Sequence, residues 1–133
     1  MKALIVSDIH SNIEAFQSVV DDANRQGGFD EIWSLGDLIG YGPDPSAVIG
    51  LLRQHEHKAV IGNHDLASID KLSLEAFNPY AKAANLWNGK QLTSDERDFL
   101  DKQPQVIEEG EFVMCHGSPR DPVWEYVVSI NAA

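Results

Sequence analysis

The sequence predicts an α/β fold with a mostly parallel sheet, for two reasons. Short apolar runs alternate with longer stretches whose apolar residues recur at helical spacing, and strands separated by helices pair in parallel through right-handed crossovers. Polar residues that suit metal binding follow the strands directly, where an open α/β sheet forms its ligand-binding crevice. The 133 residues fit one domain, which we take to span residues 1–133.

The first half of the chain predicts strand, helix, strand, helix and strand in that order. The strands are the apolar runs at residues 3–6, 31–35 and 58–61. A capping box of Ser11 and Glu14 predicts the start of the first helix, which ends at Gly27-Gly28. The second helix opens at Asp44, with Pro45 at its first helical position.

The second half is predicted to be helical over residues 66–102, where Thr93 and Glu96 form another capping box. Two strands then form a hairpin, at residues 105–107 and 112–115. The apolar run from Val127 to Ile130 stops abruptly. Such a run suggests an element that has been cut off, and we expect a domain truncated at its C-terminus.

Composition and charge exclude several classes of function. The hydrophobic content of 43% and charged content of 23% are those of an ordinary globular protein. No apolar run approaches the ~20 residues that span a bilayer, so we expect no membrane association. The single cysteine, Cys115, agrees with a cytoplasmic location. The net charge of −11 argues against binding to a nucleic acid polymer, which requires a basic surface.

Candidate metal ligands follow four of the predicted strands. They are Asp8 and His10, then Asp37, then Asn63 beside His64, and finally His116. Carboxylate and imidazole ligands together favour Mn, Fe, Zn, Co or Ni over Ca or Mg. Each residue alone has an ordinary explanation as a turn residue, a cap or a structural histidine. Four strand ends that all carry a suitable ligand are not explained by turn chemistry alone, and we therefore predict a metal site.

The combination of motifs resembles the signature of the calcineurin-like metallophosphoesterases. The motifs are Asp8-Ile9-His10, Gly36-Asp37, Gly62-Asn63-His64-Asp65 and His116-Gly117. The segment after His116 resembles a small bacterial branch of that superfamily. The resemblance implies hydrolysis of phosphate esters at two divalent metal ions, of which Mn is favoured, with a bridging hydroxide as nucleophile. It also implies a two-sheet α/β sandwich whose second sheet comes from the C-terminal part.

The resemblance also implies roles for individual residues. Asp8 and His10 would bind the first metal ion, Asp37 would bridge both, and Asn63 and His116 would bind the second. His64 would be the general acid that protonates the leaving oxygen, which an imidazole can do near neutral pH.

Two further residues are candidates for binding a small phosphorylated substrate. They are Asn12 and Arg120, whose guanidinium suits bidentate phosphate binding. An ordinary surface arginine is the alternative for Arg120. Phosphomonoesters, phosphodiesters, cyclic nucleotides and dinucleoside polyphosphates all remain open as substrates.

Three features depart from the family pattern. The family continues to a Gly-His-x-His segment that gives each metal another histidine, and the sequence ends at Ala133 without it. Gly40 and Tyr41 stand where protein serine/threonine phosphatases have Asp and Arg, so the sequence does not resemble that branch, and Asp65 is the candidate to orient His64. Without further strands, apolar surface on the sheet would be exposed, and either another segment covers it, or the domain is unstable, or it forms a homo-oligomer.

Two rival interpretations make different predictions. A non-catalytic relative would keep the fold and bind metal or phosphate without the last ligands. An unrelated nucleotide-binding protein would need a glycine-rich loop after the first strand. The sequence there, Asp-Ile-His-Ser-Asn, has no glycine, so we rank the second interpretation low.

Overall fold

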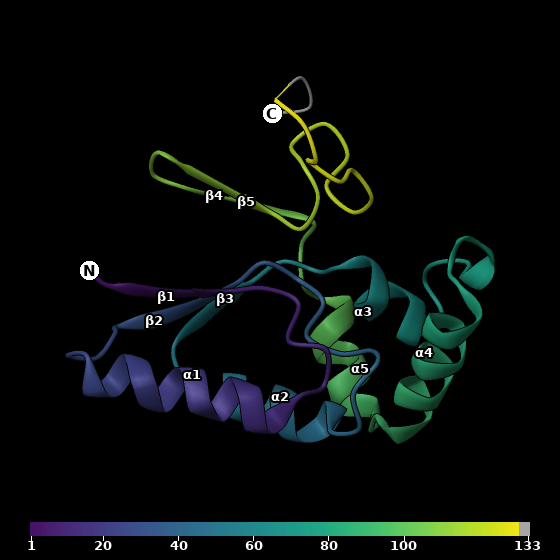
Figure 1. Ribbon diagram of the computed structural model, residues 1–133, viewed down its shortest axis with the longest axis horizontal. Coiled ribbons are helices and arrows are strands. Elements are labelled where there is room, and N and C mark those ends of the chain that lie inside the picture. The colour runs from purple at the N-terminus through teal and green to yellow at the C-terminus, as the bar shows by residue number, and fades with distance from the viewer. Residues whose placement is uncertain (131–133) are drawn as a thin grey trace.

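The computed structural model describes residues 1–130 (Figure 1); residues 131–133 of the predicted domain lie outside it. The first five elements alternate as predicted: β1 (Ala3–Val6), α1 (Ile13–Arg25), β2 (Glu31–Ser34), α2 (Pro45–Arg53) and β3 (His57–Ala59). The others are α3 (Asn63–Ser68), the 3-10 helix η1 (Leu74–Ala76), α4 (Pro79–Gln91), α5 (Ser94–Asp101), β4 (Val106–Glu109) and β5 (Phe112–Cys115). The capping box of Thr93 and Glu96 is confirmed at the start of α5.

The strands form two sheets. A parallel sheet has the order β1-β2-β3, and an antiparallel hairpin pairs β4 with β5. In Figure 1, α1 and α2 cover one face of the parallel sheet, and the hairpin lies over the other. His116 therefore follows a strand of the second sheet, which corrects the argument that one parallel sheet would carry all four polar clusters.

Each face of the parallel sheet has its own core. Between the sheet and the helices lie fully buried side chains that include Ile32, Leu52 and Leu100. Between the sheet and the hairpin, Trp33 and Val60 pack with Met114. The predicted α/β class is confirmed, and the hairpin stacks on the sheet as the second layer of a sandwich.

The start of α1 differs from the prediction. Asn12 is the N-cap, and its Oδ1 accepts a hydrogen bond from the Ala15 N–H (3.0 Å). Ser11 is fully buried with φ 55°, and its Oγ donates to Asn88 Oδ1 (2.6 Å). The predicted capping box of Ser11 and Glu14 is therefore wrong, because the left-handed turn at His10 and Ser11 moves the helix start one residue onward. Asp44 precedes α2 as predicted, but its carboxylate makes no capping hydrogen bond.

Apolar side chains remain exposed at the sheet margins, as the sequence led us to expect. Ile5 in the edge strand β1 is 58% exposed, and Phe112 on the hairpin is 61% exposed. The run from Val127 to Ile130 has no helix or strand and is largely exposed. Within residues 1–130, none of the helices is both long enough and apolar enough to cross a membrane.

Candidate metal centre

The loops after β1, β2 and β5 and the start of α3 bring the predicted ligands together. Donor atoms of Asp8, Asp37 and His116 lie within 4.8 Å of one another, and so do those of His10, Asp37 and His64. Asp37 belongs to both groups. A carboxylate that bridges two metal ions must be placed in this way.

The two carboxylate oxygens of the buried Asp37 have different surroundings. Oδ1 accepts a hydrogen bond from the backbone N–H of His64 (2.9 Å). Oδ2 lies 3.3 Å from His116 Nε2 and 3.7 Å from His10 Nε2. The protein thus fixes one oxygen, and the other faces two imidazoles.

Hydrogen bonds to backbone carbonyls orient two of the histidine rings. His10 Nδ1 donates to the Ile39 carbonyl (3.2 Å), and His116 Nδ1 donates to the Leu35 carbonyl (2.9 Å). Each ring therefore presents Nε2 to the site, an arrangement typical of metal-binding histidines. His116 Nε2 also lies 2.9 Å from Asn63 Oδ1. This mixture of carboxylate, imidazole and amide donors fits first-row transition metal ions.

His64 is oriented by a side chain that the sequence analysis missed. Its Nδ1 donates to the amide oxygen of Asn85 on α4 (3.0 Å). The hypothesis that Asp65 orients His64 is wrong, because the Asp65 carboxylate accepts hydrogen bonds from the Ile39 and Gly62 N–H groups instead. The one available signal was a pair of asparagines, Asn85 and Asn88, three residues apart in a segment predicted to be helical. Asparagine has a low helix propensity and is disfavoured in the interior of a helix.

Several site residues have a backbone conformation that is unusual outside glycine. Positive φ angles occur at Asp8 (54°), His10 (49°), Asp37 (53°) and Tyr41 (55°). Such residues cost about 1–3 kcal/mol each and concentrate at functional sites. The loops also touch closely, since a Cβ at Gly36 would lie 2.9 Å from the Cα of Gly62. The chain is therefore held in a strained arrangement where the ligands meet.

The charges of the site favour cations beside the carboxylates. Burial opposes the protonation of His116, but the hydrogen bond and charge of Asp37 outweigh it and raise the pKa of His116 to about 9. A hydrogen bond with His10 lowers the pKa of Asp8 to about 2, although burial acts against it. Burial lowers the pKa of His64 below its ordinary value. Positive charge is thus stabilised around Asp8 and Asp37, and divalent metal ions would be stabilised by the same field.

The two predicted substrate-binding residues are engaged by other groups. The oxygen of Asn12 caps α1. The guanidinium of Arg120 pairs with Glu125 (Nη2 to Oε1, 2.7 Å). Glu125 lines a cavity of about 260 Å³ together with Asp8 and His116. Arg120 is therefore connected to the site through its ion pair.

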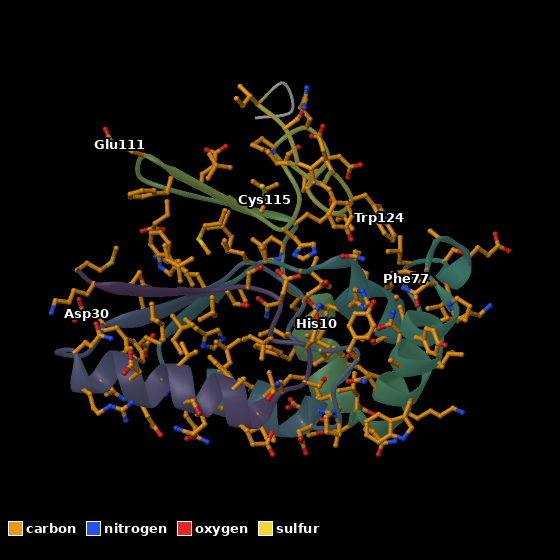
Figure 2. The ribbon with its side chains drawn as sticks, viewed as in Figure 1. His10, Asp30, Phe77, Glu111, Cys115 and Trp124 are labelled. Carbon is orange, nitrogen blue, oxygen red and sulfur yellow. The ribbon has the colours of Figure 1, made fainter. Side chains whose placement is uncertain are left out.

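Aromatic rings surround His64. The sequence motifs predict no role for them. The ring centroids of Tyr41 and Phe77 lie 4.7 Å and 5.0 Å from that of His64. Trp124 packs on Phe77 at 5.2 Å, and Figure 2 shows this pair beside the site, with His10 at the end of the parallel sheet. The rings separate His64 from bulk water on this side.

Removal of the Asp65 carboxylate is expected to destabilise the fold. Asp65 is fully buried and joins the loops after β2 and β3 through the N–H groups of Ile39 and Gly62 (3.0 Å each). Each donor left unpaired costs about 1–3 kcal/mol. Asp65→Ala should therefore lower the free energy of unfolding by about 2–6 kcal/mol in urea denaturation. The exposed control Asp21→Ala should change it by less than about 0.5 kcal/mol. Equal effects of the two changes would contradict a clamping role for Asp65.

Comparison with known proteins agrees with this geometry. Residues 1–131 match the model of the calcineurin-like phosphoesterase family. A crystal structure of a metallophosphoesterase from Sphaerobacter thermophilus is similar, with a TM-score of 0.81 and 44% identity over 96% of this chain and 51% of that one. An uncharacterized protein of Methanocaldococcus jannaschii is 38% identical over an alignment 128 residues long, which covers 92% of this chain and 52% of the relative.

A third relative is named for an enzymatic activity. The symmetrical bis(5'-nucleosyl)-tetraphosphatase of Vibrio campbellii is 28% identical over an alignment 139 residues long, gaps included, which covers 100% of this chain and 50% of the relative. The chain thus spans about half the length of the curated relatives it matches. The family match includes both sheets and every loop that carries a predicted ligand. The chain therefore belongs to the calcineurin-like phosphoesterase family.

Proposed function

We propose that the protein hydrolyses phosphate esters with the help of two divalent metal ions, of which Mn²⁺ is favoured. The observation that carries the proposal is the placement of Asp37, whose Oδ2 faces both His10 and His116. Paired catalytic metal ions about 3.5–4 Å apart clamp the attacking and leaving oxygens. A buried carboxylate shared by two groups of donors is suited to hold such a pair.

We assign the donors to two sets around Asp37 by their pairwise contacts, in which Asp8 Oδ1 lies 3.6 Å from His10 Nε2 and His116 Nε2 lies 2.9 Å from Asn63 Oδ1. Asp8 and His10 would hold one ion, and Asn63 and His116 the other. When bound, the ions would lower the pKa of a shared water and stabilise the charge of the phosphoryl oxygens. The Nδ1–H of His64 is held by Asn85, so the second proton of the imidazolium form would lie on Nε2, and from there it would pass to the leaving oxygen and leave the neutral ring.

Metal removal tests this proposal directly. Chelation should abolish hydrolysis of p-nitrophenyl phosphate or bis-p-nitrophenyl phosphate, and Mn²⁺ should restore it, because the nucleophile depends on the bound ions. Elemental analysis should find two ions per chain after reconstitution. A sample treated with chelator already saturated with Ca²⁺ is the control. Full activity of the metal-stripped protein would reject the proposal, and two bound ions without turnover of any ester would instead support a non-catalytic binding protein.

We propose a small phosphorylated substrate for this site. The net charge of −11 disfavours a nucleic acid polymer. The Vibrio campbellii relative is named for bis(5'-nucleosyl) tetraphosphates, so this compound belongs in the substrate panel beside simple mono- and diesters. We also propose that the protein works in the cytoplasm, with which its single free thiol, Cys115, is consistent.

Arg120 is proposed to position the phosphate of the substrate. Its ion pair with Glu125 holds the guanidinium near the cavity beside Asp8. An exposed charge contact contributes up to about 1 kcal/mol, so Arg120→Ala should raise KM about 5-fold and change kcat less. Arg53→Ala is the matched control, since Arg53 forms an exposed pair with Asp95. An unchanged KM would remove Arg120 from the site.

A further inference from the structure

We propose that Asn85 is a positioning residue for His64, a role that rests on the proposed function of His64 as proton donor. The His64 Nδ1 to Asn85 Oδ1 distance is 3.0 Å. Asn85 is fully buried, and His64 is only 6% exposed. The contact therefore forms in the interior, where water does not compete for either partner.

The direction of this hydrogen bond selects the reactive nitrogen. An amide oxygen can only accept, so the hydrogen belongs to His64 Nδ1. Nε2 is then the nitrogen that exchanges a proton with the substrate. Asn85 also prevents the ring from turning, because rotation about the Cβ–Cγ bond would break the contact.

The absence of a side chain at Gly40 makes room for the contact. Gly40 has φ +96°, and a Cβ there would lie 2.8 Å from His64 Nδ1 and 2.9 Å from Asn85 Oδ1. Asn88, one turn along α4, accepts from the Gly40 N–H (3.2 Å) and from Ser11 Oγ (2.6 Å). The two asparagines thus have different partners. Asn88 binds the loop of Gly40, and Asn85 binds the ring of His64.

The stability of the fold does not account for an asparagine at position 85. Its Nδ2 is buried and has no hydrogen-bond partner within residues 1–130. A buried N–H group without a partner destabilises a fold, and leucine has a similar size without that cost. The feature that favours asparagine here is its oxygen, which bonds to His64 Nδ1.

Kinetics of matched variants test the proposal. In the Mn²⁺-loaded protein, Asn85→Leu should lower kcat for alkyl phosphates about 10- to 100-fold, as is typical for lost outer-shell partners, with little change in KM. The loss should be smaller for nitrophenyl esters, whose leaving groups need little protonation. Asn85→Asp keeps an acceptor and should recover most of kcat. Asn88→Leu makes the same substitution one helical turn away, and it should change kcat for alkyl phosphates and for nitrophenyl esters by the same factor.

A spectroscopic measurement tests the contact independently of catalysis. The protein labelled with ¹⁵N-histidine and loaded with diamagnetic Zn²⁺ should show His64 protonated at Nδ1, with the signal assigned by its loss in His64→Asn. Asn85→Leu should shift the proton toward Nε2, whereas Asn88→Leu and Asn85→Asp should retain Nδ1–H. If Asn85→Leu does not fold, loss of Nδ1–H in Asn85→Asp overturns the proposal.

The outcomes separate this inference from the proposed function. An unchanged tautomer in Asn85→Leu overturns the contact, whatever the activity. A changed tautomer with unchanged kcat overturns the positioning role but leaves the phosphoesterase intact. If the wild type hydrolyses no ester, the proposed function fails, and with it the catalytic role of Asn85, while the tautomer still shows whether Asn85 orients the ring.

Discussion

Asp37→Asn is expected to release metal from both sites and to lower kcat/KM by more than the roughly 10- to 100-fold that follows loss of an outer-shell partner. The amide oxygen of the variant can keep the hydrogen bond from the His64 N–H that Asp37 Oδ1 now accepts. Its NH2 group then replaces Oδ2, which faces His10 and His116. An amide N–H donates hydrogen bonds and cannot coordinate a cation, so both ions lose a ligand at once.

The comparison with His10→Ala tests the bridging role. His10 is proposed to bind one ion, so its loss should leave the second site more fully occupied than Asp37→Asn does. Elemental analysis and kcat/KM should be measured for both variants beside Asp21→Asn, which changes an exposed carboxylate on α1. Equal metal content in wild type and Asp37→Asn would rule out a bridging carboxylate.

His64→Asn is expected to lower kcat for esters with poor leaving groups by about 10²–10⁴-fold, the range typical of general acid catalysis. Esters of nitrophenol should lose less, because nitrophenolate leaves without a proton. Both metal ions should remain, since the variant keeps every proposed ligand. The measurement is metal content together with kcat across a series of leaving groups.

A result other than the expected one for His64→Asn would also assign a role to this residue. A donor atom of His64 lies within 4.8 Å of those of His10 and Asp37, so the geometry also suits a ligand. A variant that loses metal would assign His64 to the metal centre. Intact metal with equal losses across the series would make His64 an electrostatic donor to the phosphoryl oxygens.

The ligand cluster could be predicted because its residues follow strands. The alternation of apolar runs and helical stretches predicts the parallel sheet, and the sheet brings Asp8, Asp37 and Asn63 to one edge. His116 was expected at the same edge but arrives from the hairpin that stacks on the sheet. Local patterns predict strands, whereas the assignment of a strand to a sheet depends on contacts between Trp33, Val60 and Met114 that are distant in sequence.

The residues behind the cluster could not be predicted from local patterns. Ser11 followed by Glu14 satisfies the capping-box pattern, yet the left-handed turn that brings His10 into the site makes Asn12 the cap. Asn85 and Asn88 lie in an ordinary helical segment without a motif. Their functions depend on α4 packing against α3 and on the loop of Gly40, and a single sequence does not specify these long-range distances.

The hydrogen bonds from His10 and His116 to backbone carbonyls also bear on how the metal ions are acquired. These bonds tie both rings to backbone carbonyls of the fold, so they restrict the side-chain conformations that the two ligands would otherwise lose on metal binding. We therefore expect ions to exchange at this site without unfolding, unlike in zinc fingers, whose folding depends on the metal. Since the donor set suits several first-row ions, the metal content of the protein should follow the supply of those ions in the cell.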